Sequence, residues 1–314
     1  MGLSLVTGGA GFIGSHLVDA LLQQGQTVRV LDNFSTGHRR NLLGVTDRIQ
    51  LIEGDITDLE TVRSAMRDVE VVYHQAALAS VPRSVANPIA THRDCVDGTL
   101  NVLVAAREAG VRRVVYAASS SAYGNSPLLP RREEEPVSPM SPYAAAKLAA
   151  EHYCAAFTQV YGLQTVRLRY FNVFGPRQSP ESAYAAVIPL FIQAMTAGKS
   201  PMVHGDGQQS RDFTYVADVV QANLLAAQAE KASGKVYNVA CGHRTSLLEL
   251  IAILNELLGT QIAPVLGPPR PGDVLHSQAS IDRARADLGY NPTTTVRQGL
   301  EKCLSWWRQR QRAA

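Results

Sequence analysis

Short apolar runs rich in β-branched residues alternate with amphipathic stretches through the first half of the chain. The amphipathic stretches include 15–24 and 98–108, where apolar residues recur at helical spacing. Strands that are apolar throughout and alternate with helices are typical of a parallel sheet covered by helices on both faces, and ligands of such sheets bind at the carboxyl ends of the strands. We expect buried strands at 3–6, 27–31, 49–52, 71–74, 114–118 and 165–170.

The pattern changes beyond Asn172, where prolines interrupt it and a segment dense in proline and glycine follows at 264–272. These features predict a smaller, loop-rich lobe that closes over the crevice at the sheet edge. The fold class that we predict is α/β, with a doubly wound, Rossmann-type parallel sheet. Residues 1–174 are expected to form the Rossmann domain, with a returning strand near 235–241, and residues 175–314 the substrate-binding lobe.

The composition is that of a chain with a large core, since 46% of its 314 residues are hydrophobic and 18% are charged. The net charge is only +3 and the charges are interspersed, so neither nucleic acid nor a membrane is expected as a main partner. No signal peptide or membrane-spanning run is recognisable, which favours a cytoplasmic protein. The charged run 131–135 is interpreted as a solvated loop. Widely spaced cysteines predict free thiols and no metal site: Cys95, Cys154, Cys241 and Cys303.

A glycine-rich turn follows the first predicted strand, with Gly8, Gly11 and Gly14 spaced as G-x-x-G-x-x-G before a predicted helix. The missing Cβ atoms allow backbone N–H groups to approach a pyrophosphate at the helix N-terminus. Asp32 ends the second strand, about 20 residues on, where a carboxylate accepts from ribose hydroxyls. A carboxylate there repels a 2′-phosphate, which favours NAD over NADP. Alternatively, Asp32 is only a turn residue before Asn33. Asp55, which follows the third strand, is expected near the edge of the adenine.

Three side chains suggest an acid–base site. Tyr143 and Lys147 are four residues apart, which places them on one face of a helix that Pro142 can start. An ammonium near a phenol lowers the tyrosine pKa, and a nicotinamide cation adds to this, so Tyr143 is a candidate general base. Ser119 follows the fifth strand, where its hydroxyl can bind a reacting sugar oxygen. Taken alone, Tyr143 and Lys147 could be a pair on a surface helix, and Ser119 could be a turn residue. Because all three occur in this order, they favour a catalytic site.

These features together resemble the extended short-chain dehydrogenase/reductases along essentially the whole chain. Within that family, the chain is most similar to bacterial UDP-N-acetylglucosamine/UDP-glucose 4-epimerases, and the segments that carry this similarity are 75–84, 170–175, 183–189 and 205–213. The resemblance implies that the catalytic residues are Ser119, Tyr143 and Lys147, and that the protein is a homodimer built on helices such as 98–108 and 143–161. The sequence differs from the usual family pattern at Cys95, a position where most members have an asparagine.

The resemblance also implies binding residues. Those expected to contact NAD are Gly8, Gly11, Phe12, Ile13, Gly14, Asp32, Asn33, Ser35, Thr36, Gly37, Asp55, Ile56, Gln75, Ala76, Ala77, Ala79, Cys95, Tyr143, Lys147, Tyr170 and Val173. Those expected to contact the UDP-sugar are Ser80, Ser119, Ser121, Tyr143, Asn172, Ala186, Val187, His204, Arg211, Arg270, Asp273 and Ser277. Among these, Asn172 and the two arginines are expected at the diphosphate, Asp273 at the uridine ribose, and Ala186, Val187 and His204 around the uracil.

The residues beside Ser119 separate the reactions of the family. A 4,6-dehydratase carries Asp-Glu directly after its catalytic residue, whereas Ser120 and Ser121 stand here. A UDP-glucuronate decarboxylase usually has glutamate at the position of Ser121. The remaining reaction is 4-epimerisation through a 4-keto sugar, with Tyr143 as base and NAD as hydride acceptor.

Two questions about the reaction stay open. Some members of the family have a tyrosine at the position of Ser277, which narrows their sugar pocket. The smaller serine here predicts that UDP-N-acetylglucosamine and UDP-N-acetylgalactosamine are interconverted, together with UDP-glucose and UDP-galactose. One alternative is a UDP-glucuronate 4-epimerase, which needs a cationic or hydrogen-bonding pocket from Arg83 or Arg177. The other is a catalytically idle NAD-binding scaffold, which would be expected to have lost one of the three catalytic residues.

Overall fold

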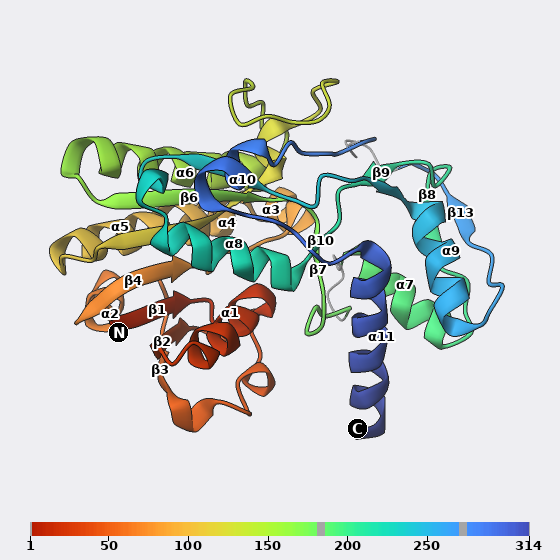
Figure 1. The fold of residues 1–314 in the computed structure, drawn as a ribbon, viewed down its shortest axis with the longest axis horizontal. Coiled ribbons are helices and arrows are strands. Elements are labelled where there is room, and N and C mark those ends of the chain that lie inside the picture. The colour runs from red at the N-terminus through yellow and green to blue at the C-terminus, as the bar shows by residue number, and fades with distance from the viewer. Residues whose placement is uncertain (1, 181–185, 270–274, 314) are drawn as a thin grey trace.

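A seven-stranded parallel sheet forms the centre of the molecule, in a computed structural model that describes residues 2–180, 186–269 and 275–313 (Figure 1). The strand order is β11-β6-β5-β4-β1-β2-β3, and every neighbouring pair is parallel. All seven predicted strands are confirmed, including the one that returns late in the chain. Their bounds are β1 (Leu3–Thr7), β2 (Thr27–Asp32), β3 (Ile49–Glu53), β4 (Val69–His74), β5 (Arg113–Ser119), β6 (Gln164–Tyr170) and β11 (Val236–Val239).

Helices cover both faces of this sheet. Successive strand residues point to opposite sides, so Leu5 packs in one apolar cluster and Val6 in the other. Because both sides are buried, the strands are mostly apolar, which is why they are recognisable in the sequence. The helices packed against the Val6 side are α1 (Phe12–Gln23) and α8 (Val216–Gln228), and those on the Leu5 side are α2 (Leu59–Ala65), α5 (Gly98–Glu108) and α6 (Pro142–Tyr161).

The strand order reverses at β1, since the chain runs outward through β2 and β3 and then returns to β4 on the other side of β1. A crevice forms at the carboxyl ends of the strands where such an order reverses, and ligands bind there. Thr7, Asp32 and His74 are the last residues of β1, β2 and β4. The predicted glycine turn and its acidic partner therefore meet at this reversal point.

A second cluster of elements has its own apolar core, which includes Phe174, Phe191, Leu250 and Leu304. Helices α7, α9 and α11 lie to one side of the sheet in Figure 1. Both α8 and β11 follow residue 174 and yet pack with the sheet, so the boundary between residues 174 and 175 stays a prediction. The elements of this part are β7 (Val173–Phe174), α7 (Val187–Thr196), β8 (Met202–His204), β9 (Ser210–Arg211), β10 (Thr214–Tyr215), β12 (Thr245–Ser246), α9 (Leu247–Leu258), β13 (Val265–Gly267) and α11 (Val296–Ala313).

Short helices complete the chain, and no helix among the described residues is long and apolar enough to cross a membrane. All four cysteines are free thiols, and three of them are buried. In 2–180, 186–269 and 275–313, no group of side chains is arranged to hold a metal ion. The short helices are η1 (Arg39–Asn41), η2 (Thr46–Arg48), α3 (Val81–Ala86), α4 (Pro88–His92), η3 (Arg93–Asp97), η4 (Ser120–Tyr123), η5 (Glu230–Ala232) and α10 (Asp282–Leu288).

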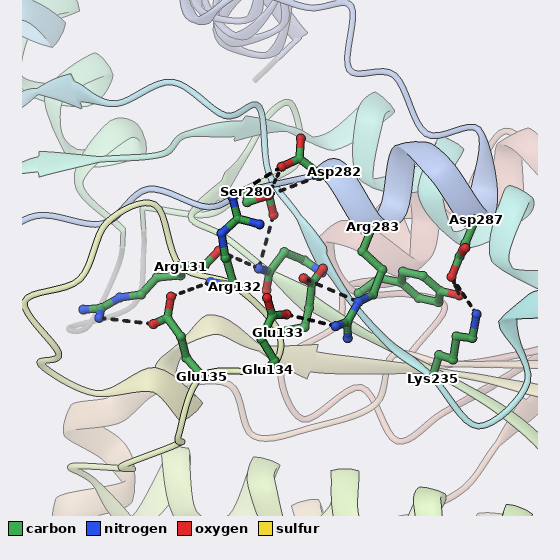
Figure 2. Close-up of polar contacts among 12 residues, drawn as sticks. Arg131, Arg132, Glu133, Glu134, Glu135, Lys235, Ser280, Asp282, Arg283 and Asp287 are labelled. Carbon is green, nitrogen blue, oxygen red and sulfur yellow. Dashed lines mark hydrogen bonds and ion pairs between the residues drawn. The ribbon is translucent and has the colours of Figure 1, made fainter.

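The charged run 131–135 is not the solvated loop that its composition predicts. Arg131 and Glu133 are buried, and Figure 2 shows the polar network around them. The backbone N–H of Arg131 donates to the carbonyl of Gln278 over 2.8 Å, and a Glu133 oxygen accepts from the backbone N–H of Asn238 over 2.8 Å. The prediction is wrong because these partners are far away in sequence, so local composition carries no sign of them.

One buried ion pair joins α6 to the sheet. Arg169 on β6 donates from Nε and Nη2 to the two carboxylate oxygens of Glu151 on α6, over 2.9 and 2.6 Å. Both side chains are only 4% exposed, so each charge depends on the other for its stability. Ser141 caps the start of the same helix by accepting from the N–H of Ala144, and Pro142 is its first residue, as predicted.

Replacing one partner of this pair should strongly destabilise the fold. We expect Arg169→Met to lower the free energy of unfolding by about 3–5 kcal/mol, because it leaves the Glu151 carboxylate buried without its partner. The matched control is Arg39→Met, which breaks the pair with Glu53, whose side chains are 59% and 61% exposed, and should cost less than about 1 kcal/mol. Urea unfolding measures both, and equal losses in the two variants would contradict this role.

Candidate active site

The glycine turn between β1 and α1 is shaped for close backbone approach. Gly8 has φ +67°, and a Cβ there would lie 2.8 Å from the backbone of Ala76 on the turn after β4. A Cβ on Gly14 would lie 2.1 Å from the carbonyl oxygen of Gly8. Gly11 caps α1 without any side-chain hydrogen bond, so backbone N–H groups of its first turn remain for a ligand. The turn thus offers an anion site at a helix N-terminus.

Asp32 is buried beside this turn, at the end of β2. One carboxylate oxygen accepts from the N–H of Ala10 and the other from the N–H of Phe34, each over 2.8 Å. Burial raises the pKa of Asp32, and these backbone hydrogen bonds oppose the rise. A carboxylate has about four lone-pair sites, so a fixed acceptor remains for ribose hydroxyls. On the neighbouring turn, Asp55 accepts from Nδ2 of Asn33 over 2.8 Å.

A cavity of about 500 Å³, the dinucleotide cavity, lies at the carboxyl ends of the central strands. Every residue expected to contact NAD lines it except Cys95. Cys95 packs with Val96 and Ala146 and is almost fully buried within η3, and it is not among the residues that line the cavity. The remaining lining residues include Leu31, Gly54, Leu78, Asp94, Ala117, Ala118, Ser119, Asn172 and Gln178.

Two residues in the wall of this cavity, Gln75 and Tyr170, belong to a hydrogen-bonded group with the buried Asn223. The Tyr170 hydroxyl contacts the side-chain amides of both Gln75 and Asn223, over 3.1 and 2.7 Å. Asn223 belongs to α8 and is fully buried, and it also donates to the carbonyl of Val219. Sequence reasoning anticipated Gln75 and Tyr170 but not Asn223, because nothing local distinguishes it from a surface helix residue.

Ser119 and Tyr143 lie together at the end of β5 and the start of α6. The Ser119 hydroxyl is close enough to lower the pKa of Tyr143, and Oγ of Ser119 lies 2.8 Å from Oγ of Ser121. Lys147, one turn along α6, is buried, with its Nζ 4.4 Å from the centroid of the Tyr116 ring. The three expected catalytic residues are therefore brought to one place.

The pKa of Tyr143 differs from the expectation drawn from its spacing to Lys147. Burial raises it to about 12, Cys95 adds to the rise, and the hydrogen bond from Ser119 opposes it. Burial also lowers the pKa of Lys147, against the effects of Cys95, Cys154 and Glu151. Loss of solvation therefore outweighs the ammonium in the chain alone, so a phenolate at neutral pH requires a further positive charge nearby.

A second cavity of about 720 Å³, the substrate cavity, opens from the first. The two share Ser119, Tyr143, Tyr170 and Asn172 in their walls. The residues expected to contact the substrate that line it are Ser80, Ser119, Ser121, Tyr143, Asn172, Ala186, Arg211 and Ser277.

A third cavity of about 290 Å³ continues beyond Asn172 and Arg211. Its wall includes Ala186, Val187 and His204, the three residues expected around a uracil. Arg270 and Asp273, expected at the phosphates and ribose, lie outside the described residues. The amide of Asn172 donates to Oγ of Ser277 over 3.1 Å, which fixes both at the junction of the cavities.

Four residues that the sequence left unassigned or undecided are placed by the structure. Gln178 lines all three cavities, with Nε2 donating to the carbonyl of Val173 and Oε1 buried without a hydrogen bond. Arg177, the preceding residue, pairs with Asp19 over 2.7 Å and is absent from the substrate cavity. Arg83 and Arg131 both line that cavity. Proximity to the 170–175 segment is the one signal that could have found Gln178.

Comparison with known proteins gives a consistent result. Residues 4–240 match the family model described as NAD dependent epimerase/dehydratase family. A UDP-glucose 4-epimerase of Mycolicibacterium smegmatis is 39% identical, over 98% of this chain and 99% of that protein. A UDP-N-acetylglucosamine 4-epimerase structure from Methanobrevibacter ruminantium, in complex with UDP-N-acetylmuramic acid, is 39% identical with a TM-score of 0.94, covering 98% and 99% of the two chains. A Thermus thermophilus UDP-glucose 4-epimerase complex with NAD is 38% identical with a TM-score of 0.89, covering 98% and 99%.

The glycine turn should control dinucleotide affinity. We expect Gly14→Ala to weaken NAD binding by more than about tenfold, since a methyl group 2.1 Å from a carbonyl must displace the turn that holds the pyrophosphate. Isothermal titration calorimetry measures the dissociation constant. Gly44→Ala is the control, because nothing lies within 4 Å of a Cβ there. Unchanged affinity in Gly14→Ala would contradict the assignment of the cavity.

Proposed function

The chain belongs to the NAD-dependent epimerase/dehydratase family, and we propose that it interconverts the C4 epimers of UDP-linked hexoses. The proposed main pair is UDP-N-acetylglucosamine and UDP-N-acetylgalactosamine, with UDP-glucose and UDP-galactose as further substrates. The observation that carries the proposal is the junction of the two cavities at Ser119 and Tyr143. A group bound in the dinucleotide cavity and a sugar bound in the substrate cavity would meet at these two hydroxyls.

The dinucleotide cavity fits NAD. The turn at Gly8–Gly14 supplies backbone N–H groups for the pyrophosphate, and Asp32 supplies an acceptor for ribose hydroxyls. When bound, NAD supplies a reversible acceptor for the hydride at C4 of the sugar. The buried carboxylate of Asp32 would disfavour a 2′-phosphate, which supports NAD over NADP.

Tyr143 is proposed as the base that takes the proton of the sugar 4-hydroxyl. Ser119 lines both cavities together with Tyr143 and is proposed to orient the same sugar oxygen. The pKa of Tyr143, about 12, must fall for this step, and the positive charges available are Lys147 and the nicotinamide ring. Lys147 is held in place by burial against Tyr116. On the return step the hydride would come back to C4 and Tyr143 would give the proton back to the oxygen, so no net oxidation occurs.

The walls of the substrate cavity argue against elimination of water or carbon dioxide. Among the described residues that line it there is no aspartate or glutamate, and Ser120 and Ser121 follow the catalytic serine. A 4,6-dehydratase needs an acid there to expel the 6-hydroxyl. Epimerisation needs only one base and room for the 4-keto sugar to turn over, which a cavity of about 720 Å³ offers.

The proposed breadth toward N-acetylated sugars rests on the residues around the sugar. Ser277 and Ser121 are small and lie in the wall of the cavity with Ser119. The hydrogen bond from Asn172 keeps Ser277 in place, so the space beside it is a fixed feature. A 2-acetamido group is proposed to occupy this space.

We also propose a homodimer in the cytoplasm. Large apolar side chains are exposed on three neighbouring helices, which is unusual for a monomer. Free thiols in all four cysteines suit a reducing compartment. The exposed side chains are Val85 on α3, Ile89 on α4, and Tyr153 and Val160 on α6.

Incubation of the purified protein with UDP-N-acetylglucosamine or UDP-glucose, followed by chromatography of the C4 epimers, tests the reaction. We expect both sugars to be converted without net reduction of NAD. Tyr143→Phe should lower kcat by about 10²- to 10⁴-fold, because it removes the base. If neither sugar reacts after NAD is added, and UDP-glucuronate is not converted either, the chain would be an NAD-binding scaffold rather than an epimerase.

Substrate breadth should depend on the size of residue 277. We expect Ser277→Tyr to reduce kcat/KM for UDP-N-acetylglucosamine by more than about tenfold while UDP-glucose remains a substrate, because the ring would fill the acetamido space. The control is Ser277→Ala, which keeps the space open and should preserve the ratio of the two kcat/KM values. Equal losses on both sugars in Ser277→Tyr would disprove the assignment of this space.

A further inference from the structure

We propose that His74 is a positioning residue of the cofactor site, which as a neutral imidazole with its proton on Nε2 joins two segments of the dinucleotide cavity wall. His74 is the last residue of β4, is almost fully buried and does not line the cavity. It therefore acts through Thr7 and Thr99, to which its two ring nitrogens are hydrogen-bonded, and these three side chains are called the histidine bridge. Its role concerns the cofactor alone and is the same whichever UDP-sugar reacts.

The contacts of Thr99 decide which ring nitrogen carries the proton. Oγ1 of Thr99 lies 2.6 Å from the carbonyl oxygen of Cys95, and because a carbonyl can only accept, the single hydroxyl proton of Thr99 is used there. Nε2 of His74 lies 3.0 Å from the same Oγ1, so a hydrogen bond between them requires the nitrogen to donate. The proton of the neutral ring is therefore on Nε2.

The other ring nitrogen must then accept. Nδ1 of His74 lies 2.7 Å from Oγ1 of Thr7, so the Thr7 hydroxyl donates to it. The same Oγ1 accepts from the backbone N–H of Ala76 over 3.3 Å. In this tautomer every polar side-chain group of the buried histidine bridge has a partner. A second proton, on Nδ1, would take away the acceptor of the Thr7 hydroxyl.

The surroundings of the ring also favour its neutral form. Burial lowers the pKa of His74 to about 3, and the positive charge of Lys147 adds to this. The His74 ring packs against Tyr116 with 5.7 Å between the ring centroids, and Nζ of Lys147 lies 4.4 Å from the centroid of the same tyrosine ring. A charged His74 would therefore place a second cation near Lys147, the residue whose charge the proposed proton transfer uses.

Both ends of the histidine bridge reach the wall of the dinucleotide cavity. Ala76 lines the cavity, and Thr7, which accepts from its N–H, is followed directly by the glycine turn. At the other end, Cys95 lies on η3 next to Asp94, which lines the same cavity. Loss of His74 should therefore let these two parts of the wall shift and weaken NAD binding. The substrate cavity should be unaffected, since no member of the bridge lines it.

Nitrogen-15 NMR of the wild-type protein with labelled histidine tests the tautomer. Protonated and unprotonated ring nitrogens have well-separated chemical shifts, and the signals of His74 are those missing from His74→Gln. We expect a proton on Nε2 alone and no titration between about pH 5 and 8, the range in which an unperturbed histidine changes its charge. A proton on Nδ1, or a His74 that titrates in this range, would overturn the proposal.

Two substitutions separate the role of the ring nitrogens from packing. His74→Leu removes both hydrogen bonds and should weaken NAD binding by about 5- to 100-fold. His74→Gln keeps one neutral donor and one neutral acceptor, so we expect a loss of less than about fivefold. Titration calorimetry should show an affinity for UDP within about twofold of wild type in both variants. Unchanged NAD affinity in His74→Leu, or an equal loss for NAD and UDP, would contradict the role.

Thr7→Val tests the same bridge with a smaller change, which keeps the test open if His74→Leu does not fold. It removes one hydroxyl at nearly constant shape and should weaken NAD binding by about 2- to 10-fold. The control is Thr165→Val, because Thr165 is equally buried and donates to the carbonyl of Cys154 over 2.8 Å, but lines neither cavity. Equal losses of NAD affinity in the two valine variants would refute the proposal. None of these measurements requires turnover, so they stand even if neither UDP-sugar reacts.

Discussion

The site depends on how α6 is held against the ends of β5 and β6. Tyr143 and Lys147 belong to the first turns of this helix, and the buried pair between Glu151 and Arg169 anchors it to the sheet one turn further on. Burial of this helix places the Tyr143 hydroxyl beside Ser119 and also removes it from water. The same packing that positions the base therefore raises its pKa to about 12. In this arrangement proton transfer depends on the positive charges brought beside Tyr143.

Much of the fold follows directly from the sequence. Strands buried on both faces are mostly apolar, so all seven could be placed before the structure. The glycine turn could be placed because its spacing is typical of a turn where Cβ atoms, as at Gly8 and Gly14, are not tolerated. Most of the residues expected to contact the cofactor or the substrate could also be placed, because many of them directly follow a strand, and ligands of such a sheet bind at the strand ends. Local pattern could not show that Arg131 is buried or that Asn223 donates to the Tyr170 hydroxyl, because both depend on partners far away in sequence.

The spacing of residues in the sequence predicts the fold better than it predicts the pKa values of the side chains. The four-residue spacing of Tyr143 and Lys147 correctly predicts a shared helix face. Spacing says nothing about desolvation, which has the largest effect on the pKa of both groups. Cys95 illustrates a similar limit: a resemblance places it at the cofactor, whereas the π-helical turn buries its side chain among Val96 and Ala146. The direction in which a side chain points is decided by packing that the local sequence does not encode.

The central claim is that the hydrogen at C4 leaves as hydride to a cofactor held in the dinucleotide cavity and returns from there. Epimerisation of a UDP-hexose carrying deuterium at C4, in ordinary water, tests it most directly when both epimers are analysed by mass spectrometry. We predict that deuterium is retained at C4 in both epimers, because the hydride never exchanges with solvent. Replacement of the deuterium by solvent hydrogen would contradict the claim and would indicate proton abstraction from carbon instead.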